Sequence, residues 1–177
     1  HVMMTPFQYK RDKLLVFPEL KVFIKNKTTQ TEKFSFKNVL KTAGKKYVIF
    51  SPNEVHSALN RLVSHKRGLG FDVEVVSKES LGNDFETIKN KIHKKYKKQS
   101  FDYALVVGHE QKFPTDYVMT SNDPKTPSDL GYFTMSGNSD NIPDVLFGRL
   151  TADTVQDVEN QITKIIYTFF YYRLSKV

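Results

Sequence analysis

The chain has 177 residues, of which 39% are hydrophobic and 13% aromatic, and its formal net charge is +8. This length and composition fit one globular domain, with or without an appendage, and exclude a largely disordered chain. The sequence contains no cysteine, which excludes disulfides, zinc–thiolate sites and a cysteine nucleophile within these residues. No apolar run approaches the ~20 residues of a membrane-spanning helix, so we predict no membrane span.

Residues 1–45 differ in character from the rest of the chain. Leu14–Phe17 and Leu20–Ile24 are typical of short strands, and Pro18 separates them. Residues 26–45 are polar and rich in Lys and Thr, which indicates a linker or exposed loop. Two strands do not form a stable sheet alone. We therefore expect this β segment to complete a β-structure that lies mostly upstream, or to pack on the domain that follows.

From residue 46 onward, short apolar runs alternate with amphipathic segments. Four strands are expected, at Tyr47–Phe50, Phe71–Val76, Tyr103–Val107 and Val145–Leu150. Acids at Asp72 and Glu74 favour a sheet edge for the second of them. The alternation predicts an α/β fold with a parallel sheet flanked by helices. Right-handed crossovers favour the flavodoxin-like strand order 2-1-3-4.

Three helices are expected between and after these strands. Ser51 is expected to cap the first, with Pro52 in its first position and Glu54 returning the bond to the Ser51 amide. Gly82-Asn83-Asp84 is expected to start the second, and Thr151 or Thr154 to cap the third. Their apolar faces are predicted at Val55, Ala58, Leu59, Leu62 and Val63; at Phe85, Ile88, Ile92 and Tyr96; and at Val155, Val158, Ile162, Ile165, Ile166 and Phe169.

Much of the positive charge lies on the second expected helix. Its lysines are Lys89, Lys91, Lys94, Lys95, Lys97 and Lys98. No aromatic or arginine pattern suited to base stacking accompanies them, so a solvated helix face is the better interpretation. We predict no nucleic-acid partner, and a basic nucleic-acid-binding protein stays as a minor alternative.

Motifs for phosphate chemistry are missing from the sequence, since no glycine-rich loop follows a strand in the required context. His109 follows Gly108 at the carboxyl end of the third expected strand, where ligands gather in open α/β sheets. It is a candidate base or ligand, but a loop residue is the simpler interpretation, because no serine or cysteine nucleophile with an orienting acid can be assigned to it. His56, His65 and His93 are expected at the surface of helices.

Asp140 and Asp144, with the Ile142 carbonyl between them, form a candidate hard-cation site. Calcium takes carboxylate and backbone oxygens in loops of this kind. The alternative is that Asp140 lies in a solvated turn and that Asp144 merely precedes a strand.

Several segments, in this order, resemble the gingipain-type cysteine peptidases of peptidase family C25. Residues 47–52 and 62–76 resemble the start of the peptidase domain of that family. Residues 103–109 resemble its "D-Y-V-L-L-V-G-D" segment, and residues 129–150 its "G-x-D-x-x-P-D-V-x-I-G-R-L" segment. The likeness covers roughly residues 46–170.

This resemblance implies a caspase-like fold with two subdomains, of which residues 46–177 would be the first, non-catalytic one. Residues 1–45 would be the end of a β-rich propeptide-like domain. Family members are secreted or surface-located bacterial endopeptidases, which hydrolyse peptide bonds with a Cys–His dyad in the second subdomain. No residue of this chain is assigned a catalytic role. The expected partners are the second subdomain, the propeptide-like β domain and protein substrates.

The family also binds calcium near the loop that enters the fourth strand. This carries over to Asp140, the Ile142 carbonyl and Asp144, with Glu110 as a further candidate ligand because His109 stands where the family has an acid. Two functions follow: part of a secreted gingipain-like cysteine endopeptidase, or a catalytically inactive peptidase-like scaffold or binding module of a bacterial secretion or surface system.

Overall fold

The computed structural model describes residues 7–10, 13–16, 44–121, 123, 125–136 and 142–174. The chain divides into two compact units, residues 1–41 with 171–177 and residues 42–170. In the first unit, β1 (Phe7–Lys10) and β2 (Lys13–Val16) form an antiparallel pair with Phe7 opposite Val16. The strand predicted at Leu20–Ile24 lies outside the described residues.

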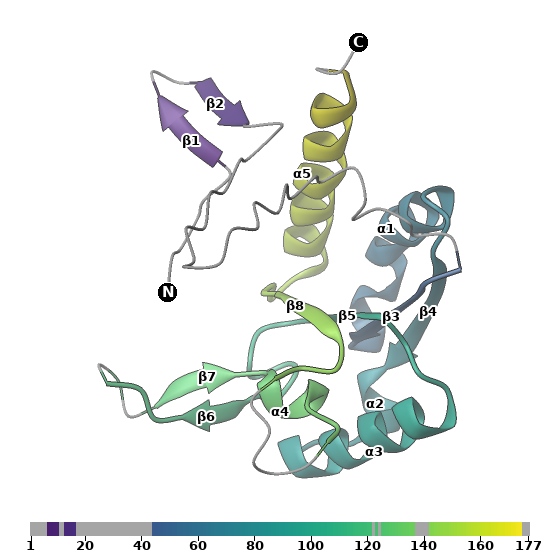
Figure 1. Ribbon diagram of the computed structural model, residues 1–177, viewed down its shortest axis with the longest axis vertical. Helices are drawn as coiled ribbons and strands as arrows, with labels where there is room; N and C mark the ends of the chain where they lie inside the picture. Colours follow the sequence, from purple (N-terminus) through teal and green to yellow (C-terminus); the bar gives the residue numbers. More distant parts are fainter. Residues whose placement is uncertain are drawn as a thin grey trace, which may run out of the picture. The chain divides into compact units, whose positions relative to one another are not determined.

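The second unit is built on a four-stranded parallel sheet in the order β4–β3–β5–β8 (Figure 1). Its strands are β3 (Lys46–Ser51), β4 (Asp72–Ser77), β5 (Tyr103–Val107) and β8 (Leu146–Leu150). Numbered along the chain within this sheet, the order is 2-1-3-4, which confirms the prediction. The strand with Asp72 and Glu74 is an edge strand, as expected. All three pairings are parallel.

Helices cover both faces of this sheet, as predicted. α1 (His56–Gly68), which follows a 3-10 turn at Asn53–Val55, packs with α5 (Val155–Leu174) on one face. α3 (Phe85–Lys98) covers the other face together with the short helices α2 (Lys78–Leu81) and α4 (Leu130–Phe133). Side chains alternate along each strand, so Ile49 joins the first core and Val48 and Phe50 the second.

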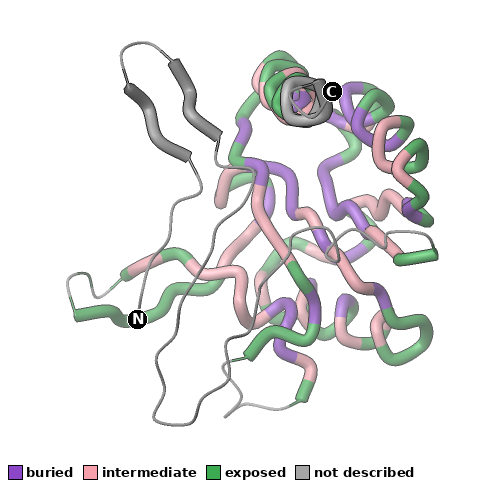
Figure 2. The backbone as a smooth tube through the Cα atoms, turned by 45° about the horizontal axis from the view of Figure 1, so that its top comes forward, coloured by how far each residue is buried: buried purple, intermediate pink, exposed green. Residues whose placement is uncertain are grey.

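Burial of the predicted apolar faces holds these layers together. Figure 2 shows the central strands buried between helices whose outer faces are exposed. The residues predicted for the face of α1 are all buried, as are Ile88 and Ile92 of α3 and Val158 and Ile162 of α5. Each such aliphatic side chain contributes about 1.5–3 kcal/mol when fully buried. The α3 lysines lie on the solvent side, with Lys89 and Lys95 half-buried.

The start of α1 differs from the prediction. Ser51 is the last residue of β3, it is fully buried, and its hydroxyl has no hydrogen-bond partner among the described residues. The Asn53 N–H donates instead to the Glu79 carboxylate, at 3.2 and 3.3 Å, and Glu54 pairs with Lys112. The predicted capping box is wrong because Ser51 lies opposite Ser77 and continues the pairing of β3 with β4.

The other two long helices begin where the sequence predicted. Asp84 Oδ1 accepts a hydrogen bond from Thr87 N at 2.9 Å. At α5, Thr154 Oγ1 accepts from Asp157 N at 3.1 Å, and Asp157 Oδ2 accepts from Thr154 N at 3.1 Å. This reciprocal pair is a capping box with aspartate in the acidic position, and it decides for Thr154 over Thr151.

The connection between β5 and β8 contains more structure than the predicted polar excursion. β6 (Asp116–Val118) and β7 (Thr126–Ser128) form an antiparallel hairpin, and α4 follows it. Tyr132 and Phe133 of α4 are fully buried. Gly131 allows α4 to pack closely against α3, because a Cβ there would lie 2.9 Å from Phe85 Cζ of α3. Within the described residues, no helix combines the length and apolarity required to cross a bilayer.

Candidate functional site at the carboxyl end of the sheet

The loop after β5 leaves the sheet through a glycine and is bonded to the end of β8. Gly108 has a φ of +117°, a conformation that favours glycine. Its N–H donates to Leu150 O at 3.0 Å, and the His109 N–H donates to Ala152 O at 3.1 Å. The loop then turns back, with the Phe113 N–H donating to His109 O at 2.8 Å. His109 therefore occupies the predicted place at the carboxyl end of a central strand.

A pocket of about 210 Å³ opens at this edge of the sheet. His109 and Glu110 line it after β5, Pro127–Asp129 line it at the end of β7, and Arg149 and Thr151 line it from β8 and the residue that follows. Ligands of parallel α/β sheets bind at the carboxyl ends of their strands. This pocket is therefore the candidate functional site of the described residues.

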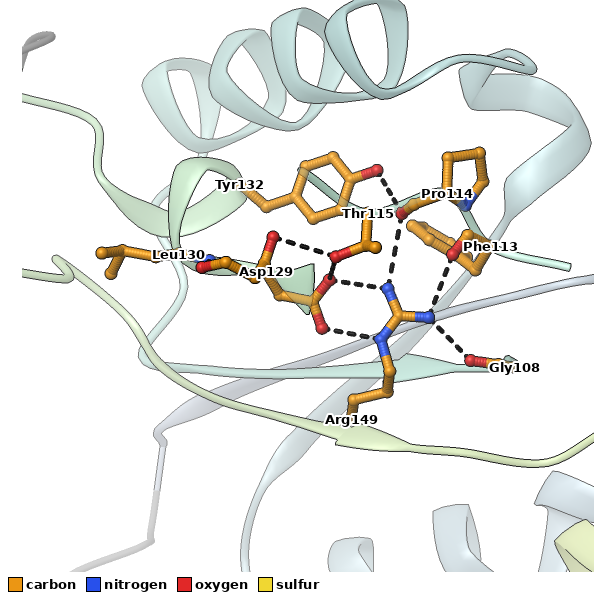
Figure 3. A network of polar contacts seen from close by, with 9 residues as sticks. Gly108, Phe113, Pro114, Thr115, Asp129, Leu130, Tyr132 and Arg149 are labelled. Atoms are coloured by element: carbon orange, nitrogen blue, oxygen red, sulfur yellow. Dashed lines mark hydrogen bonds and ion pairs between the residues drawn. The ribbon is translucent and has the colours of Figure 1, made fainter. Parts of the chain in front are cut away.

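An ion pair between Arg149 and Asp129 lies in the lining of this pocket, and Figure 3 shows its hydrogen bonds. Arg149 Nε donates to Asp129 Oδ2 at 2.7 Å, and Nη2 donates to Oδ1 at 2.6 Å. The two side chains are only 16% and 9% exposed. The contact is thus bidentate and largely removed from water, which is the geometry in which the arginine fork matches a carboxylate.

The remaining guanidinium donors are used by backbone carbonyls. Nη1 donates to Gly108 O at 2.7 Å and to Phe113 O at 3.0 Å, and Nη2 lies 3.4 Å from Pro114 O. All five N–H groups therefore have an acceptor, and Asp129 neutralises the charge. Arg149 has no donor left for an anionic ligand. Its role is to tie β8 to the loop of residues 108–114 and to the residue that precedes α4.

Two hydroxyl groups extend this network toward the hairpin and α4. Thr115 Oγ1 lies 2.9 Å from Ser128 O and 3.0 Å from Asp129 Oδ1. The Tyr132 hydroxyl donates to Pro114 O at 2.7 Å. Burial, reinforced by the nearby Asp129 charge, raises the pKa of Tyr132 far above its usual value. The phenol therefore remains a hydrogen-bond donor at any physiological pH.

The predicted calcium ligands are not all brought together. β8 runs parallel to β5, with Leu146 opposite Tyr103, so Asp144 lies at the amino end of the strands. Glu110 follows β5 and lies at the carboxyl end, beside His109. Five-residue strands at ~3.3 Å per residue separate the two ends by roughly 16 Å. In the structure Glu110 is therefore not near Asp144.

Asp144 instead binds the chain that follows α4. Its carboxylate accepts hydrogen bonds from Met135 N at 2.6 Å and from Ser136 Oγ at 3.2 and 3.4 Å. Ile142 is 75% exposed, and Asp140 lies outside the described residues. The described residues contain no group of three or more His, Cys, Asp or Glu side chains that could hold a metal. The carboxylate of Asp144 and the carbonyl of Ile142 are nevertheless oxygen donors of the type that calcium takes.

The Arg149–Asp129 network was not predicted from the sequence, although one signal was present. Arg149 lies within an apolar strand between Gly148 and Leu150, and an arginine in such a place needs a partner. The surface position expected for the helical histidines is also only partly right. His93 is half-buried and donates from Nε2 to Gly131 O at 3.1 Å, so it joins α3 to α4. His56 is half-buried too, with Nε2 3.3 Å from Ser51 O.

The fold and the site together define a caspase-like α/β domain, in which a four-stranded parallel sheet carries its pocket at the carboxyl edge. The chain belongs to peptidase family C25, whose family model matches residues 41–169. This match confirms the resemblance seen in the sequence. No curated protein sequence matches the chain.

Solved structures share this fold. The arginine-specific cysteine proteinase gingipain R (RgpB) superposes with a TM-score of 0.61 at 24% identity, over 72% of this chain and 29% of that chain. The complex of Porphyromonas gingivalis RgpB pro- and mature domains gives 0.61 at 22%, over 69% and 28%. A structure described as a protease gives 0.60 at 22%, over 69% and 27%. The chain thus spans less than a third of each of these three chains.

Proposed function

We propose that this chain forms the non-catalytic α/β subdomain of a secreted gingipain-like cysteine endopeptidase. The observation that carries this proposal is the family match over residues 41–169 in a chain that holds no cysteine. A thiolate activated by a histidine attacks the peptide carbonyl and forms an acyl-enzyme in such peptidases. The cysteine would come from polypeptide outside these 177 residues. The resemblance to the family implies the same for the histidine. The present chain would then supply one wall of the substrate cleft.

The edge strand β8 indicates where a neighbouring subdomain would pack. Within the described residues, β8 pairs with β5 alone, Leu146 is 66% exposed, and nothing lies within 4 Å of a Cβ built on Gly148. The opposite edge strand, β4, presents Asp72 and Glu74 instead. The charge of Arg149 in β8 is neutralised by Asp129, so this edge presents no unpaired charge. Such an edge is a template for further packing, whereas a charged edge resists it. We infer that the catalytic subdomain packs against β8.

The resemblance described above supports the remaining parts of the proposal. Residues 1–45 would be the end of a propeptide-like β domain, residues 46–177 the first peptidase subdomain, and the whole protein would reach the bacterial surface or medium and act on protein substrates. Cell fractionation with an antibody against this chain tests the location. A purely cytoplasmic signal would contradict it.

Peptide hydrolysis by the full-length gene product tests the activity. We expect cleavage of a fluorogenic peptide library, with loss of cleavage after alkylation by iodoacetamide and after replacement of the nucleophilic cysteine. The 177-residue chain is expected to cleave none of these peptides and serves as the negative control. A full-length protein that folds but cleaves nothing would instead favour the inactive scaffold, and activity that resists alkylation would contradict a cysteine mechanism.

We also propose that calcium binds through Asp140, the Ile142 carbonyl and Asp144. The support is the oxygen donor set and the position of Asp144 at the entry of β8, where an ion would stabilise the loop rather than take part in hydrolysis. The thermal midpoint is expected to rise with calcium relative to EDTA, and Asp140→Ala should abolish this rise. Magnesium, which prefers rigid octahedral sites, is the control ion. A wild-type midpoint that ignores calcium contradicts the site.

A further inference from the structure

The β6–β7 hairpin projects from the four-stranded sheet (Figure 1). It also carries exposed apolar side chains. Tyr117, Val118 and Met119 follow one another at the end of β6 and are 42%, 39% and 82% exposed. Consecutive exposed apolar residues are unusual on a soluble surface unless they meet a partner. Among the described residues, this run of three exposed apolar side chains lies in the hairpin.

The described residues near the turn of this hairpin are joined by hydrogen bonds to one another. Thr120 N donates to Asp123 O at 2.9 Å, Asp123 N donates to Thr120 Oγ1 at 3.1 Å, and Lys125 N donates to Asp123 Oδ1 at 2.8 Å. Lys125 Nζ also lies 4.9 Å from the centre of the Tyr117 ring. A surface that is ordered before binding loses less entropy when a partner arrives. The exposed apolar residues are therefore held in a preorganised form.

The base of the hairpin borders the pocket at the carboxyl edge. Tyr117 lies opposite Pro127, so the two side chains share one face, and Pro127 lines the pocket. The Tyr117 hydroxyl is hydrogen-bonded to Glu110, which raises the pKa of Tyr117, and Glu110 lines the same pocket. A polypeptide lying across the carboxyl edge would therefore pass along this face.

Strand addition to the hairpin is disfavoured on both sides. Pro127 has no N–H to offer at the outer edge of β7. On β6, the N–H of Tyr117 already donates to Asp116 Oδ1 at 2.8 Å. Recognition by the hairpin must therefore rely on side chains rather than on backbone hydrogen bonds.

The charges beside the apolar run indicate the kind of partner. No ion pair involves Glu110, Asp116 or Asp123 among the described residues. A partner with basic side chains complements these carboxylates.

We propose that the β6–β7 hairpin is a substrate-binding arm. Tyr117 and Met119, which share one face of the strand, contact an apolar side chain of an extended polypeptide, and Val118 flanks this contact from the opposite face. Glu110, Asp116 and Asp123 attract basic residues next to it. This assignment rests on the proposed function, because it takes the polypeptide to be the substrate of the peptidase. The contact lies outside the catalytic groups and would add affinity without changing the chemical step.

Fluorescence anisotropy with the 177-residue chain tests the arm directly. The probe is a labelled, serine-rich peptide with one leucine between lysines, and the matched peptides carry serine for the leucine or glutamate for the lysines. We expect the V118S/M119S double variant to bind the probe about tenfold more weakly, equivalent to ~1.4 kcal/mol. Tyr167→Ser, which removes an exposed aromatic of α5, is the matched control and should bind as the wild type does.

Equal affinity of the wild type and the double variant for the probe would overturn the arm, and so would equal binding of the glutamate peptide. Concentration-dependent dimerisation that is lost in the double variant would assign the hairpin to self-association and also overturn it. In the full-length protein, we expect the double variant to raise KM for a protein substrate and to leave kcat unchanged. If the full-length double variant shows thiol-dependent hydrolysis with an unchanged KM, the substrate-binding arm is refuted and the proposed function stands. Hairpin-dependent peptide binding in a protein without hydrolysis would remove the proposed function instead.

Discussion

Asp129 and Arg149 stand 20 residues apart in the chain and meet through two hydrogen bonds of 2.7 and 2.6 Å. One residue precedes α4 and the other lies in β8, so the pair closes the segment between them into a loop. Since Arg149 also bonds to Gly108 O, the same side chain holds the start and the middle of the long connection between β5 and β8. The position of the candidate site thus depends on one arginine.

Replacement of Arg149 by alanine should destabilise the protein by about 3–5 kcal/mol, because the Asp129 carboxylate would be left largely buried without a partner. Urea unfolding at neutral pH measures this loss. The double variant R149M/D129L is expected to lose less than R149A, since no charge remains unpaired. Lys112→Ala, which removes the exposed pair with Glu54, is the control and should leave the midpoint nearly unchanged. A cost for R149A no larger than that of this control would contradict the structural role.

Gly131→Ala should destabilise the contact between α3 and α4. The new Cβ would lie 2.9 Å from Phe85 Cζ, and Phe85 packs on Tyr132 with ring centroids 4.6 Å apart. Overpacking of this kind costs about 1–3 kcal/mol. Adding Phe85→Leu to Gly131→Ala should recover part of the loss in thermal melts. Gly68→Ala meets nothing within 4 Å and serves as the neutral control; equal melting of the two alanine variants would refute the clash.

Stability should fall in acid through Glu74. Burial pushes the pKa of Glu74 upward, but hydrogen bonds and charges from Lys95 and Lys46 outweigh this and hold the pKa below its usual value. A lowered pKa in the folded state gives stability that is present above the unfolded value, about 4.3, and is lost as pH falls through the folded value. We expect the unfolding midpoint to drop below about pH 4.5, and the drop to be smaller in Glu74→Gln. The measurement is the slope of the unfolding free energy against pH in the wild type and in Glu74→Gln. Identical slopes in the two proteins would contradict a contribution from Glu74.

Thr154→Ala should cost about 1 kcal/mol, because it removes the side-chain oxygen that accepts from the Asp157 N–H at the start of α5. The reciprocal bond from the backbone N–H of residue 154 to Asp157 Oδ2 would remain. Thr151→Ala removes the same atoms three residues earlier without touching the cap. Guanidinium unfolding of the two variants side by side provides the comparison. A larger effect at Thr151 would show that the helix starts elsewhere.

Sequence patterns predicted those parts of the fold whose burial and hydrogen bonds depend on residues close together in the chain. Tyr103–Val107 reads as a buried parallel strand since both of its faces are covered. Asp84 caps α3 through a bond to a residue only three positions away. Ser51 failed because a non-local pairing with β4 competes with the local capping pattern, and the pairing prevails.

The site was harder to predict for a related reason. The acceptors around Arg149 include the carbonyls of Gly108 and Phe113, which any residue type provides, so their positions leave no trace in composition or periodicity. The hairpin escaped notice because each strand has three residues and Pro127 lies in one of them. Only the placement of His109 at the carboxyl edge followed from the order of strands and helices.

The bonds at the root of the hairpin also determine how this part of the molecule opens. Thr115 bridges Ser128 and Asp129, Asp129 holds Arg149, and α4 begins at the next residue and packs on α3. The hairpin is therefore not a separate flap, because lifting its base requires the end of β8 to loosen at the same time. Amide protons at the base of β7 and in α4 should exchange with solvent as one cooperative unit, more slowly than those near Met119.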